Sequence, residues 1–262
     1  MRLDIYLTVS GLAQSRTRAQ ELIVGGFVAV DGKVIRKASY AVDEDAPPSI
    51  EVTGKPHPFV GRGGVKLEGA LETFKIDVTG AVCADIGAST GGFTDCLLRR
   101  GASRVFAVDS GSEQLDSTLR SDSRVVNIER FNARNLTPET FGCWCDVAVA
   151  DLSFISQTYV LANISAVLRE DGIYIGLIKP QFECGPKALD KRGIVRSMTE
   201  HAAAIRRVRD AAQTVSLVMQ RVIVSPIHGG DGNTEFLCLC KKTSDANIEC
   251  VSDNEINKLV KS

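Results

Sequence analysis

Residues 82–94 constrain the fold of this chain more than any other stretch. An apolar run that contains Asp85 is followed by small residues and glycines, and then by a segment that can form a helix. This order predicts a strand, a tight turn and a helix. Gly87, Gly91 and Gly92 allow backbone conformations and close approaches that a Cβ would prevent. The turn therefore predicts a place where bare backbone lies against a ligand, with a carboxylate at the carboxyl edge of the strand.

The spacing of this turn, Asp-x-Gly-x-x-x-Gly-Gly, narrows the class of ligand. It matches neither the Gly-x-Gly-x-x-Gly pattern of dinucleotide-binding folds nor the Gly-Lys-Ser/Thr ending of a phosphate-binding loop. These mismatches argue against NAD and ATP. Other nucleoside-binding α/β folds remain compatible with the turn alone.

A second strand, expected at residues 104–108, ends before Asp109. An acid at this position can reach the ribose hydroxyls of a nucleoside. The turn and the acid together resemble the cofactor site of S-adenosylmethionine-dependent methyltransferases, and the resemblance implies that cofactor. The expected cofactor contacts are Asp85, Gly87, Ser89, Gly91, Gly92, Phe93, Asp109 and Asn132.

The rest of the chain alternates apolar segments with helical ones, and further strands are expected at residues 125–128, 146–150, 173–178, 218–224 and 234–240. This order predicts an α/β fold with a doubly wound, Rossmann-like sheet of seven strands, the last two forming an antiparallel hairpin. We expect this domain at residues 61–243, after a proline-rich linker at 53–60. Residues 244–262 are expected to form a weakly ordered tail with at most one short helix.

Residues 1–52 predict a small α+β domain with two short helices and a hairpin turning at Asp31-Gly32-Lys33. Residues 2–37 hold six basic residues against three acidic ones. The ordered set that begins with Arg2-Leu3-Asp4 and Gly11-Leu12-Ala13 and ends at Lys37 resembles the RNA-binding module of ribosomal protein S4. The resemblance implies contacts with RNA phosphates, which position a protein without reading sequence. With a basic stretch before the second domain, the candidate RNA contacts are Arg2, Arg16, Arg18, Lys33, Lys37 and Arg62.

Four charged residues are expected to meet at one edge of the sheet. Asp151 and Lys179 end the fourth and fifth strands, and Glu235 lies near the start of the antiparallel seventh. Pro180 disfavours helix at Lys179, which should stay extended at this edge. Ligands of such sheets bind beyond the carboxyl ends of the strands. Lys66, at the start of the helix before the first strand, can reach the same place.

This set resembles the Lys-Asp-Lys-Glu tetrad of FtsJ-like ribose 2′-O-methyltransferases. Over residues 2–241 the chain resembles the TlyA family, called haemolysin A in older usage, with matching segments at 85–94, 132–134, 151–156, 179–183 and 232–235. The family implies methylation of a cytidine 2′-hydroxyl in ribosomal RNA. We assign Lys179 as general base with help from Lys66, and Asp151 and Glu235 as the groups that orient the lysines. A lysine amine serves as a base when burial or a second cation lowers its pKa, whereas carboxylates act in the opposite direction.

Composition limits the partners and the compartment. The formal net charge is −1, so affinity for RNA must come from local clusters of cations. No apolar run approaches the roughly 20 residues of a membrane span, and the N-terminus lacks the apolar core of a signal peptide. We therefore expect a cytoplasmic protein, without membrane contact, whose eight cysteines stay reduced. The cysteine pairs lack zinc spacing, so no metal is expected. The expected partners are ribosomal RNA or ribosomal subunits, and a monomer is favoured.

Two other functional classes are alternatives to the enzyme. One is a non-catalytic RNA-binding or ribosome assembly factor that keeps the transferase fold. The other, suggested by the older family name, is a membrane-lytic haemolysin. The complete charged set argues against the first, and the lack of an export signal or long apolar segment argues against the second. Binding of S-adenosylmethionine separates the enzyme from both.

Overall fold

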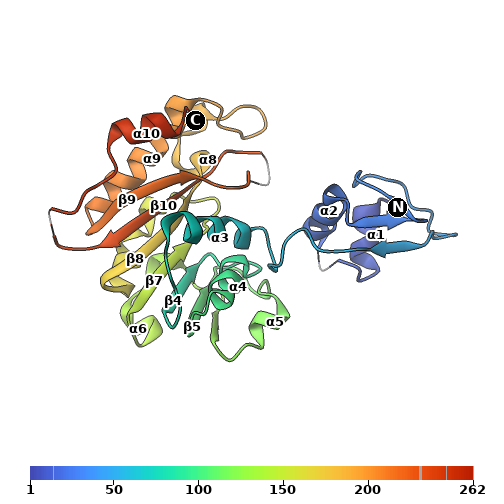
Figure 1. The fold of residues 1–262 in the computed structure, drawn as a ribbon, viewed down its shortest axis with the longest axis horizontal. Coiled ribbons are helices and arrows are strands. Elements are labelled where there is room, and N and C mark those ends of the chain that lie inside the picture. Colours follow the sequence, from blue (N-terminus) through green and yellow to red (C-terminus); the bar gives the residue numbers. More distant parts are fainter. Residues whose placement is uncertain (14, 230–231, 246, 262) are drawn as a thin grey trace. The chain divides into compact units, whose positions relative to one another are not determined.

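A computed structural model describes residues 1–13, 15–229, 232–245 and 247–261 of the chain (Figure 1). It divides into two compact units, residues 1–58 and 59–262. Phe59 is buried in the core of the second unit, and the Val60 N–H donates to Asp95 Oδ2 at 2.9 Å. These two contacts place the end of the expected linker, residues 59 and 60, in the second unit.

The first unit is a small α+β domain. Its elements are α1 (Leu3–Val9), α2 (Arg16–Gly25), β1 (Val28–Val30), β2 (Lys33–Val34) and β3 (Ile50–Val52), and its antiparallel sheet has the order β2-β1-β3. Ser15 caps α2 by accepting the Arg18 N–H. Asp31 and Gly32 both have positive φ at the hairpin turn, as the sequence predicts. Leu3, Leu7 and Ile23 are fully buried between the helices and the sheet.

The second unit is built on a seven-stranded sheet with the order β6-β5-β4-β7-β8-β10-β9. The strands are β4 (Val82–Ile86), β5 (Arg104–Val108), β6 (Val125–Ile128), β7 (Cys145–Ala150), β8 (Leu168–Ile178), β9 (Leu217–Val224) and β10 (Phe236–Lys242). The neighbouring strands from β6 to β8 pair in parallel, and β10 is antiparallel to both β8 and β9. The predicted doubly wound sheet with a closing antiparallel hairpin is confirmed.

Helices cover both faces of this sheet (Figure 1). The larger helices are α3 (Gly63–Phe74), α4 (Gly92–Arg99), α7 (Leu161–Val167), α9 (Met198–Gln213) and α10 (Asp253–Leu259), with short helices α5 (Ser117–Arg120), α6 (Pro138–Phe141) and α8 (Pro180–Glu183) and single turns at Ala133–Asn135, Gln157–Tyr159 and Pro186–Ala188. Along β4, Cys83 packs with α3 and α4, whereas Ala84 and Ile86 pack with the core of α7 and α9. The alternation follows from the two-residue repeat of a strand.

The C-terminal segment differs from the weakly ordered tail expected from the sequence. Val251 and Ile256 are buried in the same core as α9, and the Val251 N–H donates to Met219 O at 2.8 Å. Ser252 and Glu255 form a reciprocal capping box at the start of α10. Leu259 and Val260 pack against the same core, and Asp253 pairs with Arg206 and Arg209 of α9, so apolar contacts and ion pairs together hold this helix on the domain.

The cysteines lie as isolated thiols in the structure. Cys145, Cys238 and Cys240 are buried, as expected for small apolar residues on strands, whereas Cys143 is half-buried. Among the described residues, no group of three or more His, Cys, Asp or Glu side chains is placed to hold a metal ion.

Candidate active site

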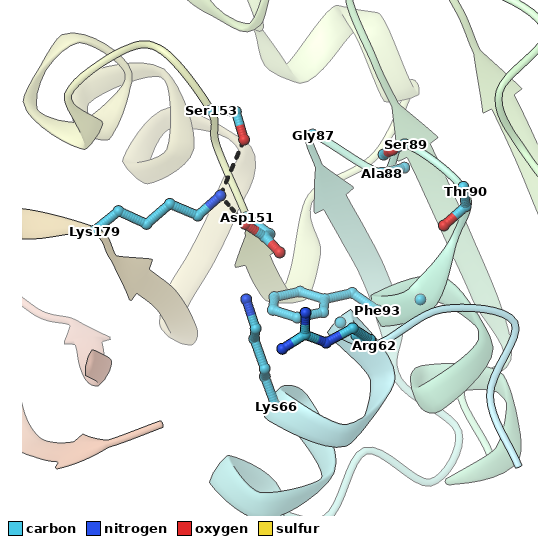
Figure 2. A pocket seen from close by; sticks show the side chains of 12 residues that line it. Arg62, Lys66, Gly87, Ala88, Ser89, Thr90, Phe93, Asp151, Ser153 and Lys179 are labelled. Carbon is cyan, nitrogen blue, oxygen red and sulfur yellow. Dashed lines mark hydrogen bonds and ion pairs between the residues drawn. The ribbon is translucent and has the colours of Figure 1, made fainter. Parts of the chain in front are cut away.

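The carboxyl-end edge of the sheet brings the four predicted charged residues together as two ion pairs. Lys179 Nζ lies 2.7 Å from Asp151 Oδ1, and Lys66 Nζ lies 2.6 Å from Glu235 Oε2. Figure 2 shows the Lys66 and Lys179 side chains extending toward Asp151 from different elements. Both lysines and Glu235 are at least nine-tenths buried. A buried ammonium group is costly unless it is paired, so each lysine needs its carboxylate.

The strand pairing explains why residues so distant in sequence converge. Phe236 pairs with Ile178 in the antiparallel β10–β8 ladder, so Glu235, which precedes Phe236, and Lys179, which follows Ile178, lie at the same edge. The backbone of Lys179 is extended (φ −110°, ψ 101°) and Pro180 begins α8, as predicted from the proline. Lys66 is the fourth residue of α3, which lies against α4 and β10.

A polar cavity of about 260 Å³ is lined by three of the four charged residues, Lys66, Asp151 and Lys179, whereas Glu235 lies behind Lys66 and does not line it (Figure 2). Its lining includes Arg62, Lys66, Asp151, Ser153 and Lys179, together with the glycine turn. Ser153 was not foreseen from the sequence, although it lies within a segment that carries the family resemblance. Lys179 Nζ donates to Ser153 Oγ at 3.0 Å, which adds a second contact that fixes the ammonium group.

A second cavity of about 400 Å³ shares four lining residues with the first, so the two adjoin. The shared residues are Gly87, Ser89, Asp151 and Ser153. The second cavity also contains Asp109 and Asn132, while Gly92 and Phe93 line the first. Six of the eight expected cofactor contacts therefore line one continuous cleft.

The other two expected contacts, Asp85 and Gly91, do not line either cavity. Asp85 is fully buried beneath the turn, where its Oδ2 accepts the Thr94 hydroxyl at 2.7 Å. Burial raises the pKa of Asp85 to about 7, the Thr94 hydrogen bond opposes the rise, and the charge of Asp151 adds to it. Gly91 has φ +94°, and a Cβ there would lie 2.3 Å from Leu119, so this glycine shapes the turn from behind.

Asp109 joins the glycine turn to the end of β5. Its Oδ2 accepts the Ser89 N–H at 2.8 Å, and its Oδ1 accepts the Gly111 N–H at 2.7 Å. Gly87 has φ +84°, and a Cβ at this residue would lie 2.7 Å from the backbone oxygen of Asp151. The narrow gap between the β4 and β7 loops thus requires glycine, and the Asp109 carboxylate lies beside this turn along the cleft.

Comparison with known proteins identifies the family. A model described as FtsJ-like methyltransferase matches residues 59–242, and one described as S4 domain matches residues 1–46. The 16S/23S rRNA (cytidine-2'-O)-methyltransferase TlyA of Mycobacterium tuberculosis is 43% identical over 244 residues, which cover 93% of this chain and 91% of that protein. This chain belongs to the TlyA family of FtsJ-like methyltransferases. The resemblance stated from the sequence is confirmed.

Two further relatives of this TlyA-family chain carry the older name. Hemolysin A of Brachyspira hyodysenteriae is 41% identical over 239 residues, which cover 90% of this chain and 98% of that protein. A solved structure of a hemolysin candidate from Streptococcus thermophilus has a TM-score of 0.80 at 34% identity, and the match covers 100% of this chain and 94% of the other. In the part of the TlyA-family chain that the structure describes, no helix is long and apolar enough to cross a bilayer.

The six candidate RNA contacts fall into two groups, of which the first lies in the S4 domain. Arg2 and Arg16 both form ion pairs with the buried Asp4. These contacts, chiefly the hydrogen bond from the Arg2 guanidinium, hold the pKa of Asp4 well below its usual range. About half of each arginine side chain stays exposed, at 44% and 56%. Lys33 and Lys37 are exposed on the hairpin and the segment after it. These four cations are therefore accessible, and two of them also stabilise the domain.

The remaining two candidates lie in less open positions. Arg18 is mostly covered, because its Nη1 contacts Glu21 at 3.2 Å and the His57 ring at 3.1 Å. Arg62 lines the active-site cavity, and its Nη2 donates to His228 O at 2.5 Å. Arg62 therefore belongs with the candidate active-site cleft of the TlyA-family domain, a position that the sequence pattern did not reveal.

Proposed function

We propose that this TlyA-family protein transfers a methyl group from S-adenosylmethionine to the ribose 2′-hydroxyl of a cytidine in ribosomal RNA. The observation that carries the proposal is the pairing of two buried lysines with two carboxylates beside the glycine turn. The M. tuberculosis relative is named for this cytidine-2'-O reaction on 16S and 23S RNA. An RNA substrate of this kind also places the protein in the cytoplasm with the ribosomes.

The larger cavity fits the proposed cofactor. Asp109 offers a carboxylate at the end of β5, where an acid can accept hydrogen bonds from ribose hydroxyls. Ser89, Asn132 and the backbone at Gly87 supply polar groups along the same 400 Å³ space, and Phe131 and Ile155 supply apolar surface. Bound here, S-adenosylmethionine supplies a methyl group made electrophilic by its sulfonium charge.

The smaller cavity fits the acceptor hydroxyl. A ribose hydroxyl is a weak nucleophile, and it must lose its proton while it is aligned with the methyl group. We assign Lys179 Nζ as the base that takes this proton, since it lines the cavity and is held by Asp151 and Ser153. Lys66 lines the same cavity and brings a second amine to the place proposed for the acceptor hydroxyl. Glu235 holds Lys66 in place and balances its charge.

The S4 domain fits the role of RNA anchor. The exposed cations Lys33 and Lys37, with Arg2 and Arg16, can neutralise phosphates on a domain separate from the catalytic one. Phosphate contacts of this kind bring RNA to the enzyme and leave the choice of nucleotide to the catalytic cleft.

The decisive experiment supplies tritiated S-adenosylmethionine with separated ribosomal subunits and naked ribosomal RNA, and maps the label to a nucleotide. We expect label on a cytidine ribose. In the Lys179→Ala variant we expect cofactor binding to persist in calorimetry and methyl transfer to fall below detection. The matched control is Lys258→Ala, which removes an exposed lysine from α10. Label on a base, or normal turnover in Lys179→Ala, refutes the proposal, and a wild-type protein that does not bind the cofactor supports a non-catalytic factor.

A further inference from the structure

A buried polar network lies directly behind the paired Lys179 and Asp151. Glu183, the last residue of α8, is 2% exposed. Its Oε2 accepts the Ser156 hydroxyl at 2.5 Å, and its Oε1 accepts the Gln157 backbone N–H at 2.9 Å. These two bonds connect α8, which begins right after Lys179, to the end of the loop that carries Asp151.

The network continues into β8. Gln157 Nε2 donates to Leu177 O at 2.6 Å, and Gln157 Oε1 accepts the Tyr174 hydroxyl at 2.5 Å. Gly176 leaves room for this contact, because a Cβ there would lie 2.4 Å from the Tyr174 hydroxyl oxygen and 2.5 Å from Gln157 Oε1. The loop after β7 is thus fixed to the last residues of β8 by a fully satisfied set of hydrogen bonds.

The loop at residues 151–157 is held at both ends. At its start the Asp151 N–H donates to Ile86 O at 3.2 Å, and at its end Glu183 holds Ser156 and Gln157. Between these anchors the loop presents Asp151 and Ser153 to Lys179 Nζ. A shift of either anchor would therefore change the distances between the lysine and its two partners.

We propose that Glu183 is a positioning residue for methyl transfer, which sets the geometry of Lys179 with Asp151 and Ser153 by joining α8 to the loop after β7. The expected effect of Glu183 on methyl transfer rests on the proposed function. The link between α8 and the loop after β7 rests on the hydrogen bonds alone. Glu183 lines neither cavity of the cleft, so it acts through other residues.

Two variants of Glu183 separate positioning from a merely structural role. Glu183→Ala removes both acceptors and releases the loop. Glu183→Gln keeps an acceptor for the Gln157 N–H and can donate to Ser156 Oγ, so it should rescue the geometry. Ser156→Ala removes one bond and tests the same connection if Glu183→Ala does not fold. The matched control is Asp146→Ala, since Asp146 Oδ2 accepts the Val82 N–H at 2.8 Å at the opposite end of β7.

The first measurement is the rate at which an amine-specific acetylating reagent modifies Lys179 in the full-length chain, followed by peptide mass spectrometry. We expect this rate to rise several-fold in Glu183→Ala and less in Ser156→Ala, and to stay at the wild-type value in Glu183→Gln and Asp146→Ala. Lys66 is the internal reference, because its partner Glu235 does not contact the network. The second measurement is kcat at saturating cofactor, expected to fall about 100-fold in Glu183→Ala and to recover in Glu183→Gln, since ~1 Å of misplacement costs this much.

Each outcome bears on the proposal. An unchanged acetylation rate at Lys179 in folded Glu183→Ala and Ser156→Ala overturns it, and so does an equal rise in Asp146→Ala, which would indicate general loosening. A rise at Lys179 in a protein whose wild type methylates no RNA supports the positioning and removes the proposed function. A rise without any loss of kcat, where the wild type is active, shows that the positioning is not used in catalysis and overturns the proposal.

Discussion

The buried Lys66–Glu235 pair gives the sharpest test of how the site is stabilised. The two charges lie 2.6 Å apart with side-chain exposures of 9% and 3%. At an effective dielectric constant of ~20, their attraction is about 6 kcal/mol. Burial of the two ions costs several kcal/mol each, so the pair adds little net stability. Removal of one partner leaves the other buried and unpaired, and that costs about 3–5 kcal/mol.

We therefore expect Glu235→Leu and Lys66→Met each to lower the free energy of unfolding by about 3–5 kcal/mol, and the double variant to recover most of this loss. Urea unfolding followed by circular dichroism measures the three variants, and none of them should transfer a methyl group. The control is Lys241→Met, which breaks the exposed Lys241–Asp171 pair and should cost under about 1 kcal/mol. A double variant no more stable than the weaker single variant would refute the reasoning.

Three further predictions concern the buried Asp85, the turn residue Gly87, and the S4-domain cations Lys33 and Lys37. Because the pKa of Asp85 is raised, this carboxyl keeps its proton in the folded state between about pH 4 and 7, whereas it has lost that proton in the unfolded state. The free energy of unfolding therefore falls as the pH rises through this window. The free energy of unfolding of Asp85→Asn, measured with urea, should rise by about 4 kcal/mol relative to that of the wild type between pH 4 and 7.5. If the difference between the two proteins does not change with pH, burial of a charged Asp85 is not the cause. Gly87→Ala should weaken cofactor binding at least tenfold in calorimetry, because a Cβ there lies 2.7 Å from a backbone oxygen, whereas Gly80→Ala, also at positive φ but with nothing within 4 Å, should bind normally. Replacing both Lys33 and Lys37 by alanine should reduce the slope of log affinity for RNA against log salt by about 1.4–1.8, and an unchanged slope removes them from the interface.

The tetrad could be predicted from sequence because strand ends are readable. Lys179 follows a short apolar run rich in β-branched residues, which favours a buried strand, and Pro180 marks the point where that run stops. Parallel strands end at one edge of a sheet and an antiparallel strand begins there, so Asp151 and Glu235 are expected at the same edge as Lys179. The choice of partner within the tetrad was not predictable, because it depends on side-chain directions. The structure pairs Lys66 with Glu235 and leaves Asp151 to Lys179.

The parts that sequence reasoning missed depend on contacts between loops. Nothing in the local pattern around Ser153 shows that the loop turns its hydroxyl toward Lys179, since that direction is set by the anchor at Glu183. Asp85 was expected at the cofactor surface because the family motif contains an acid there. Its full burial follows from Thr94, whose hydroxyl reaches back from α4 and keeps the carboxylate under the turn.

The loop after β7 couples the two halves of the cleft. Asp151 lines both cavities, its backbone oxygen faces Gly87 at the turn, and its carboxylate holds Lys179. Because Asp151 contacts both the glycine turn and Lys179, the position of this loop affects the proposed donor site and the proposed base together. The anchor at Glu183 thus fixes the base relative to the donor site as well as to its own carboxylate.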